Sequence, residues 1–158
     1  MAEINSDLEY VRLLVDATLS HMGAEVPDWE SDIISYYDLD VRECTTKWSE
    51  AVYVSLRSPS GKYEQVWVYF TNSDLSLAWS TVNTASAIQD QAVEAAWGVP
   101  LPPCPGHVHP LVAQVVDGVP KWLCMKEGAS HYERDILPNF DPAFSTPEEY
   151  LLLSGRPV

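Results

Sequence analysis

Positive charge is scarce in this chain of 158 residues, in which nine Lys and Arg stand against 23 Asp and Glu, for a formal net charge of −14. Binding to the phosphates of nucleic acids requires clustered Lys and Arg, so we expect no direct contact with nucleic acid. The same deficit disfavours binding to anionic membrane surfaces. If the chain has a macromolecular partner, its charge favours a basic protein.

Long apolar runs are also absent, and no stretch approaches the roughly 20 apolar residues that a membrane-spanning helix needs. The first ten residues, MAEINSDLEY, lack the basic and apolar regions of a secretion signal. These absences predict a cytoplasmic protein that does not associate with membranes. In that compartment the three cysteines of the chain stay reduced, which favours a metal site over a disulfide.

The common catalytic and nucleotide-binding motifs are missing too. The sequence contains no G-x-x-x-x-G-K, no G-x-G-x-x-G, no H-E-x-x-H and no G-x-S-x-G. The acidic residues between positions 25 and 40 lack the glycine and the spacing of a calcium-binding loop. The sequence therefore predicts that the protein is not an enzyme.

What the sequence does contain, in residues 1–98, is the pattern of an α+β domain. Apolar residues recur at helical spacing over residues 6–22. Two β-rich runs at 51–57 and 62–70, joined by the turn residues SPSG, predict a β-hairpin. Residues 32–41 form a possible further strand.

A second helix is expected over residues 84–97. Ser86 and Gln89 have the spacing of a capping box at its start, and Gly98 is placed to end it. The order of helix, strand, hairpin and helix is typical of the α+β class.

Beyond this second helix we expect a small separate unit over residues 99–137. The four prolines of GVPLPPCPG indicate a stiff, extended connector. Asp117-Gly118 is a strong signal for a two-residue hairpin turn. A zinc-ribbon-like β-hairpin is therefore predicted from about 111 to 124, with Pro120 confined to an edge strand.

The remaining tail, residues 138–158, predicts one short helix. Thr146 and Glu149 have the spacing of a capping box around Pro147, and Gly155 follows the apolar run as a stop signal. The LLL run inside this helix is expected to dock back on the domain.

The residues that carry chemistry lie in the proline-rich stretch PPCPGHVHPL and shortly after it. Cys104 and His107 are separated by Pro105-Gly106, a turn that lets both side chains face one metal ion. Cys124 follows His107 after sixteen intervening residues, close to the spacing of zinc ribbons. Thiolate and imidazole ligands favour zinc over calcium or magnesium, which prefer oxygen.

The fourth ligand is less clear from the sequence. A zinc ribbon would place Cys or His at position 127, where this chain has Glu127. His109 and His131 are the alternatives, and His109 is preferred because it lies in the same irregular loop as His107. Two thiolates and two neutral imidazoles balance the charge of a divalent ion. Four protein ligands would make the zinc site structural, since a catalytic site keeps one position open.

The segment PPCPGHVHPL, followed by a DGV turn and KWLC, resembles a segment of small uncharacterised proteins from actinobacteria and their phages. That segment has the pattern C-P-x-H-x-H-P-L, a short hairpin and W-x-C, and it covers about 25 residues of this chain. The resemblance implies that Cys104, His107, His109 and Cys124 belong together. The relatives are expected to have proline after the last cysteine, where this chain has Met125. The resemblance implies no activity.

The leading functional hypothesis is a non-enzymatic acidic protein that binds a protein partner and contains a structural zinc site. An inhibitor or immunity-type protein that covers a basic surface is its most specific form, because complementary charge speeds such binding. Asp28, Glu30 and Asp32 are the candidate partner-binding residues. Acidic side chains are also ordinary solvated surface, so this assignment rests on charge alone.

Two other classes of function stay open. One is a metal-dependent hydrolase in which Glu127 or a water molecule completes the zinc shell. The other is a structural component of a larger assembly, such as a virion, with Leu151–Leu153 as its interface.

Overall fold

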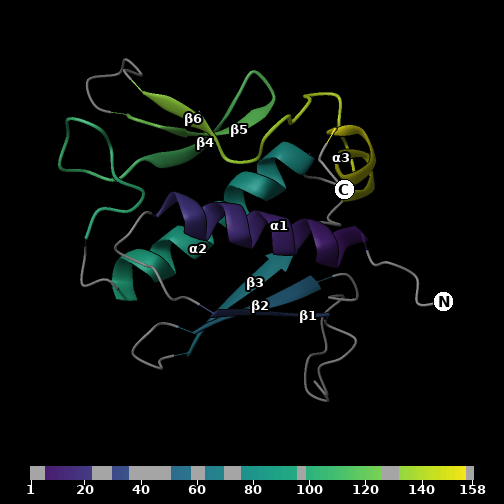
Figure 1. Cartoon of the computed structure of the whole chain (residues 1–158), viewed down its shortest axis with the longest axis horizontal. Helices are drawn as coiled ribbons and strands as arrows, with labels where there is room; N and C mark the ends of the chain where they lie inside the picture. The colour runs from purple at the N-terminus through teal and green to yellow at the C-terminus, as the bar shows by residue number, and fades with distance from the viewer. Residues whose placement is uncertain are drawn as a thin grey trace.

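A computed structural model shows an α+β fold in which two long helices lie between two small antiparallel sheets (Figure 1). Contacts of both helices with the first sheet, and of the second helix with the second sheet, agree with this layering. The structure describes residues 6–22, 30–35, 51–57, 63–69, 76–95, 99–125 and 132–155.

The first helix, α1, spans Ser6–His21, as the apolar periodicity predicts. Its core-facing side chains are completely buried: Tyr10, Val11, Leu14, Val15 and, just after the helix, Met22. These positions recur at steps of three and four residues, so one stripe of the helix faces the core.

The first sheet consists of β1 (Glu30–Ser35), β2 (Ala51–Arg57) and β3 (Tyr63–Tyr69) in the order β1-β2-β3. All neighbours are antiparallel, so the hairpin predicted from the two β-rich runs is confirmed. The possible strand of residues 32–41 is present as β1, which begins two residues earlier than expected. Residues 36–41 lie outside the described part of the chain.

The second helix, α2, spans Leu77–Ala95 and therefore begins seven residues before the predicted start at 84. Its first turn is capped by Ser76, whose Oγ accepts a hydrogen bond from the Trp79 N–H at 3.2 Å. The capping box predicted for Ser86 and Gln89 is wrong, because both residues lie in the middle of the helix. Gly98, the predicted stop, lies outside the described residues.

The beginning of α2 escaped prediction because its sequence is rich in hydroxyl residues, which are weak helix formers. In the structure two of these hydroxyls are buried and satisfied within the helix. Thr81 Oγ1 donates to Leu77 O at 2.7 Å, and Thr84 Oγ1 donates to Ser80 O at 2.8 Å. A helix packed between two sheets needs small side chains on more than one face, and Ser and Thr meet that need.

The second sheet consists of β4 (Val112–Val116), β5 (Val119–Leu123) and β6 (Glu133–Asp135) in the order β4-β5-β6. The predicted hairpin is confirmed: Asp117 and Gly118 connect β4 to β5 with φ angles of 51° and 80°. Two consecutive positive φ values are those of the type I′ turn that Asp-Gly favours.

The predicted edge position of Pro120 is wrong, because β5 is the central strand of this sheet. The proline is tolerated because β6 pairs with β5 only from Lys121 to Leu123. Just beyond that pairing, the Ile136 N–H donates to Pro120 O at 3.1 Å. Proline has no N–H to return that bond, so the ladder between β5 and β6 ends there.

The short third helix, α3, spans Pro147–Leu153, and its predicted cap is confirmed. Thr146 Oγ1 accepts from the Glu149 N–H at 3.2 Å. The helix docks mainly through Tyr150, which is 1% exposed and packs edge-on against Tyr10 with ring centroids 5.4 Å apart. The expected docking of the LLL run holds only for Leu151, since its two successors point outward.

Buried side chains from distant parts of the chain form one hydrophobic cluster. It includes residues of α1, α2 and α3, the segment before β4, and both strands of the β4–β5 hairpin. The expected units 1–98, 99–137 and 138–158 concern independent folding, which packing alone does not test, so that division stays a prediction. Among the described residues, none of the helices combines the length and apolar character that crossing a membrane requires.

Candidate metal centre

The candidate ligands lie on a short loop that the backbone closes at its base. Pro103 and Pro110 form an isolated antiparallel bridge, and the Leu111 N–H donates to Pro102 O at 2.9 Å. Inside this closure, the His107 N–H donates to Cys104 O at 3.2 Å, and Gly106 has a φ of 84°. The tight turn predicted for Pro105-Gly106 is therefore present, and it places Cys104 and His107 on one side of the loop.

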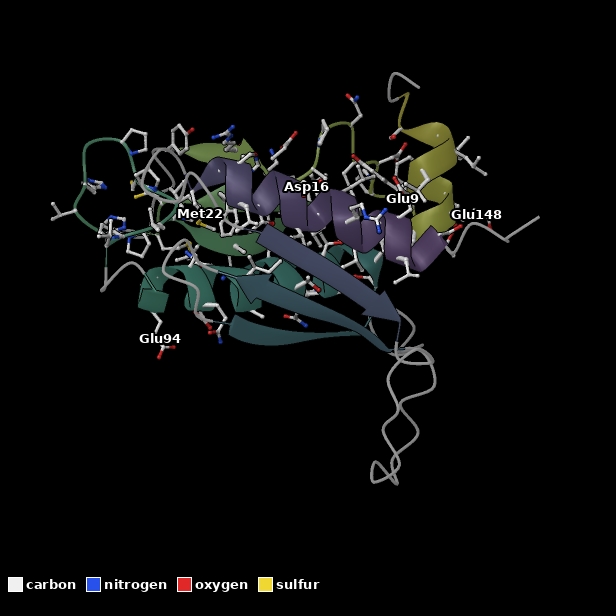
Figure 2. The ribbon with its side chains drawn as sticks, turned by 60° about the horizontal axis from the view of Figure 1, so that its bottom comes forward. Glu9, Asp16, Met22, Glu94 and Glu148 are labelled. Carbon is white, nitrogen blue, oxygen red and sulfur yellow. The ribbon has the colours of Figure 1, made fainter. Side chains whose placement is uncertain are left out.

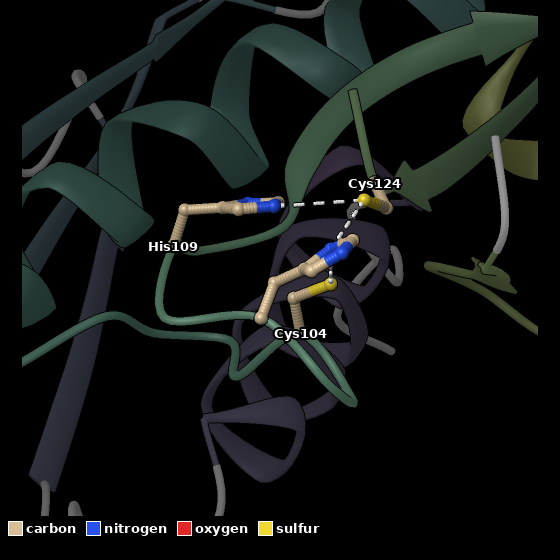
Figure 3. Close-up of side chains that lie close together, drawn as sticks. Cys104, His109 and Cys124 are labelled. Atoms are coloured by element: carbon tan, nitrogen blue, oxygen red, sulfur yellow. Dashed lines mark hydrogen bonds between the residues drawn. The ribbon is translucent and has the colours of Figure 1, made fainter. Parts of the chain in front are cut away.

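The structure brings all four preferred residues together: Cys104, His107 and His109 from the loop, and Cys124 just after β5. Their ligand atoms all lie within 4.8 Å of one another. His107 Nδ1 is 3.6 Å from Cys104 Sγ and 3.2 Å from Cys124 Sγ. Cys124 Sγ is also 3.6 Å from His109 Nε2, and Figure 3 shows these side chains converging from two segments. This cluster could hold a metal ion.

The sulfur and nitrogen ligands differ in their exposure to solvent. Cys104 and Cys124 are 4% and 0% exposed, whereas the two histidines are half-buried and Val108 between them is 96% exposed. The imidazole rings stack on each other with centroids 4.9 Å apart. The thiols thus lie on the core side of the cluster, and the imidazoles cover it on the solvent side.

His109 is oriented by its own neighbour. Its Nδ1 lies 3.1 Å from Pro110 O, and a carbonyl can only accept, so Nδ1 carries the proton and donates. In the neutral ring Nε2 is then the nitrogen without a proton, and it faces Cys124. A histidine that donates one ring N–H to a carbonyl while the other nitrogen binds is the usual arrangement around a metal ion.

Gln89 of α2 fixes the base of the loop. Its side-chain Nε2 is buried and donates to Leu101 O at 2.9 Å and to Leu111 O at 2.6 Å. These carbonyls belong to the two arms of the loop, so one amide group holds both arms against the helix. Sequence reasoning missed this role, although a long polar side chain on the core face of a helix is a sign of such a bond.

A second contact fixes the strand that leads to Cys124. Trp122 is fully buried, and its Nε1–H donates to His21 Nδ1, at the end of α1, at 2.9 Å. Burial, and then the positive charge of Arg134, lower the pKa of His21 to about 4. His21 is therefore neutral near pH 7 and can accept the indole proton.

The other candidates from the sequence are placed only in part. His131 and Glu127, the alternative fourth ligands, and Asp28 lie outside the described residues. Glu30 and Asp32 lie on β1, where their backbones pair with Arg57 and Ser55 of β2. The partner-binding role of these residues stays a prediction.

Comparison with protein families, curated proteins and solved structures found no match to this chain. The resemblance of the loop segment to actinobacterial and phage proteins therefore stays untested. The arrangement of the four side chains is the observation from which function can be argued.

Proposed function

We propose that Cys104, His107, His109 and Cys124 bind a structural zinc ion in a non-enzymatic, acidic, protein-binding domain. The observation that carries the zinc proposal is the convergence of two sulfur and two nitrogen ligand atoms within 4.8 Å. Tetrahedral coordination by sulfur and imidazole is typical of zinc. Calcium and magnesium prefer oxygen ligands.

The distances support this ion. Zinc binds sulfur at about 2.3 Å and nitrogen at about 2.0–2.1 Å, which sets tetrahedral sulfur and nitrogen ligands about 3.6 Å apart. The sulfur–nitrogen distances in the cluster are 3.6, 3.2 and 3.6 Å. Little movement of the side chains would be needed to bind the ion.

The protonation states also support a metal. His107 Nδ1 lies close to the sulfur atoms of both Cys104 and Cys124, whereas a neutral ring nitrogen offers one hydrogen-bonding site. A metal ion replaces these competing contacts with four bonds. Two thiolates balance the charge of a divalent cation, which reduces the cost of burying it.

A structural role is favoured over a catalytic one because His109 supplies a fourth ligand. Catalytic zinc usually has three protein ligands and one open position for water or substrate. In the hydrolase alternative, Glu127 or a water molecule would occupy that position instead. The ligand role of His109 therefore separates the two hypotheses.

Metal analysis of the untagged protein tests the zinc site. We expect about one zinc ion per chain, and an absorption spectrum of tetrahedral sulfur–nitrogen coordination after replacement by cobalt(II). The His109→Ala variant should bind zinc more weakly or not at all, and the His131→Ala variant should retain it. A folded protein without bound zinc would end the proposal.

A small zinc-binding inhibitor distinguishes a closed from an open site. The cobalt spectrum should not change when the inhibitor is added, because four protein ligands leave no exchangeable position. A spectral change in the wild-type protein would instead favour the hydrolase.

The protein-binding part of the proposal is supported by the net charge of −14. An inhibitor or immunity-type protein facing a basic surface is its most specific form, and association should then slow as salt rises. Capture of partners from the native host at low and high salt tests this. A cytoplasmic location and the absence of direct nucleic acid binding stay predictions.

A role in a larger assembly is the second candidate, and one observation favours it. Leu152 and Leu153 of α3 are 73% and 67% exposed, and exposed apolar pairs occur at interfaces between proteins. The mass of the purified protein in solution tests this role. A monomer at all concentrations would count against it.

A further inference from the structure

Outside the metal centre, an open groove of about 330 Å³ lies between α2 and the segment that enters β4. Its lining combines carboxylates with apolar side chains: Gln89, Asp90, Val93, Glu94, Pro110 and Val112. We propose that this groove binds an arginine side chain of a basic partner protein. The proposal rests on the proposed protein-binding role and specifies its contact chemistry.

The apolar part of the groove suits the stem of an arginine side chain. Val93, Pro110 and Val112 are all partly exposed, and Leu111 lies buried beneath them. Long basic side chains bury their methylene groups along such surfaces while the charged head stays near water.

The polar part suits the guanidinium group. Asp90 and Glu94 are exposed and lie one helical turn apart, on the face of α2 that borders the groove. Figure 2 shows Glu94 projecting outward at the end of α2, on the opposite side of the molecule from Glu148. A planar guanidinium has five donors that match carboxylates, whereas an ammonium group is a point charge with three.

Gln89 provides an acceptor that is independent of the acidic pair. Only 9% of this residue is exposed, and its Nε2 donates to Leu101 O and Leu111 O. The two hydrogen bonds from Nε2 to carbonyl oxygens fix which way the amide group points. The remaining polar atom, Oε1, can accept a hydrogen bond but cannot donate one. Among the described residues no partner of Gln89 Oε1 is seen, and the side chain lines the groove.

The placement of the two carboxylates has a cost for the helix. Like charges one turn apart repel, and a negative charge near the C-terminus of a helix opposes its dipole. Glu94 is the penultimate residue of α2, whose last turn contains no basic residue. Residues that destabilise their own helix are expected at functional sites. A bound guanidinium would reduce both the repulsion between the carboxylates and the unfavourable interaction with the helix dipole.

The test uses the full-length protein as purified and N-acetyl-arginine methylamide as the probe. Binding should shift the amide NMR signals of Val93, Glu94 and Val112. The neutral isostere N-acetyl-citrulline methylamide should bind about tenfold to a hundredfold more weakly, because charge-assisted hydrogen bonds are lost. Equal binding of the two probes would overturn the proposal, as would shifts confined to other residues.

A matched pair of variants separates the groove from general electrostatics. The double variant Asp90→Asn with Glu94→Gln should bind the arginine probe about tenfold to a hundredfold more weakly. Its unfolding temperature should be higher than that of the wild type. Asp16→Asn with Glu148→Gln removes the same charge at distant exposed positions and should leave binding unchanged. An equal loss in both variants would show charge attraction without a site.

These outcomes are independent of the zinc proposal. A protein that binds zinc through the four ligands and ignores the arginine probe would disprove only the groove. A protein that binds the probe but no zinc would disprove only the metal site.

Discussion

The hydroxyl of Tyr10 lies 2.7 Å from Thr81 Oγ1, in a buried contact that joins α1 to α2 across 71 residues of sequence. Thr81 directs its own proton to Leu77 O, so Tyr10 is the donor. Burial raises the pKa of Tyr10 well above its usual value, so the hydroxyl keeps its proton throughout the physiological range. The contact fixes the relative position of the two helices that carry the metal-binding loop and its supports.

Replacing Tyr10 by Phe removes this donor and leaves the ring in place. We expect a loss of about 1–2 kcal/mol in the free energy of unfolding. The reason is that the buried Thr81 Oγ1 no longer accepts a hydrogen bond from the Tyr10 hydroxyl. Urea unfolding measures this loss. In a Thr81→Val background the same replacement should be nearly neutral, and equal losses in both backgrounds would show that the hydrogen bond contributes nothing.

Removing the amide of Gln89 should weaken metal binding, although Gln89 is not a ligand. Gln89→Leu leaves Leu101 O and Leu111 O without their buried donor, so the arms of the loop lose their support. We expect zinc affinity to fall about tenfold to a hundredfold, measured by competition with a coloured chelator.

Gln91 offers the matched control for that experiment. It lies on the same helix, and its buried Oε1 has no hydrogen-bond partner in the part of the chain that the structure describes. Gln91→Leu should therefore leave zinc affinity unchanged. If both substitutions weaken zinc binding equally, the effect comes from a change in the helix. It would then not come from the loss of the Gln89 hydrogen bonds to the loop.

Stability should fall as the solution is acidified from about pH 6.5 to pH 4, through His21. Its pKa is 6.5 in the unfolded reference and about 4 in the folded protein. Between these values the unfolded chain binds more protons, so the stabilisation present above pH 6.5 is lost as the pH falls. We expect the free energy of unfolding to fall by about 1–2 kcal/mol. The loss is limited to this size because solvent screens the partly exposed His21.

Urea unfolding at several pH values, followed by tryptophan fluorescence, measures this loss. His21→Asn keeps an acceptor for the Trp122 N–H but does not titrate. The difference between the two proteins removes the contribution of the metal ligands and of other groups. Parallel stability curves for the two proteins across this range would rule out the role of His21.

Removing the metal should loosen the loop first. Hydrogen exchange after chelation should lose protection at the His107 and Leu111 amides, whose bonds close the loop, because metal binding supplies part of the folding free energy of such segments. The amides of α1 should keep theirs, since Leu14 and Val15 are fully buried in the shared core. Simultaneous loss in both regions would show that the ion stabilises the whole chain.

Features of the fold that depend on local chemistry were predictable from the sequence. Asp117-Gly118 gives a hairpin because both residues must have positive φ, and Gly118 also lies against Pro142, whose Cβ would be 2.8 Å from an added Cβ. Thr146 and Pro147 mark the start of α3 for similarly local reasons. Such signals act over a few residues and need no knowledge of the rest of the fold.

Features that depend on tertiary packing were not predictable. The first turns of α2 are helical because Thr81 and Thr84 are buried between layers and bond their own helix. The strand β6 contains only Glu133, Arg134 and Asp135, and it forms because β5 offers a partner. No pattern within either segment reveals these neighbours.

The candidate site divides in the same way. Cys104 and His107 are recognisable from their spacing around a turn, and the position of His109 in the same loop as His107 favours it over its alternatives. The support from Gln89 depends on two carbonyls that lie 12 and 22 residues away in sequence. Only the folded chain brings those three groups together.

The edge-on packing of Tyr10 against Tyr150 has a consequence for synthesis of the protein. At a translation rate of about 5–20 residues per second, Tyr150 is made roughly 7–28 s after Tyr10. During that interval α1 lacks the ring of Tyr150 that packs on it in the folded protein. Its apolar stripe must then be shielded from water by another molecule. The yield of folded protein in a cell should therefore depend on how ribosome-associated chaperones shield α1 until the last helix emerges.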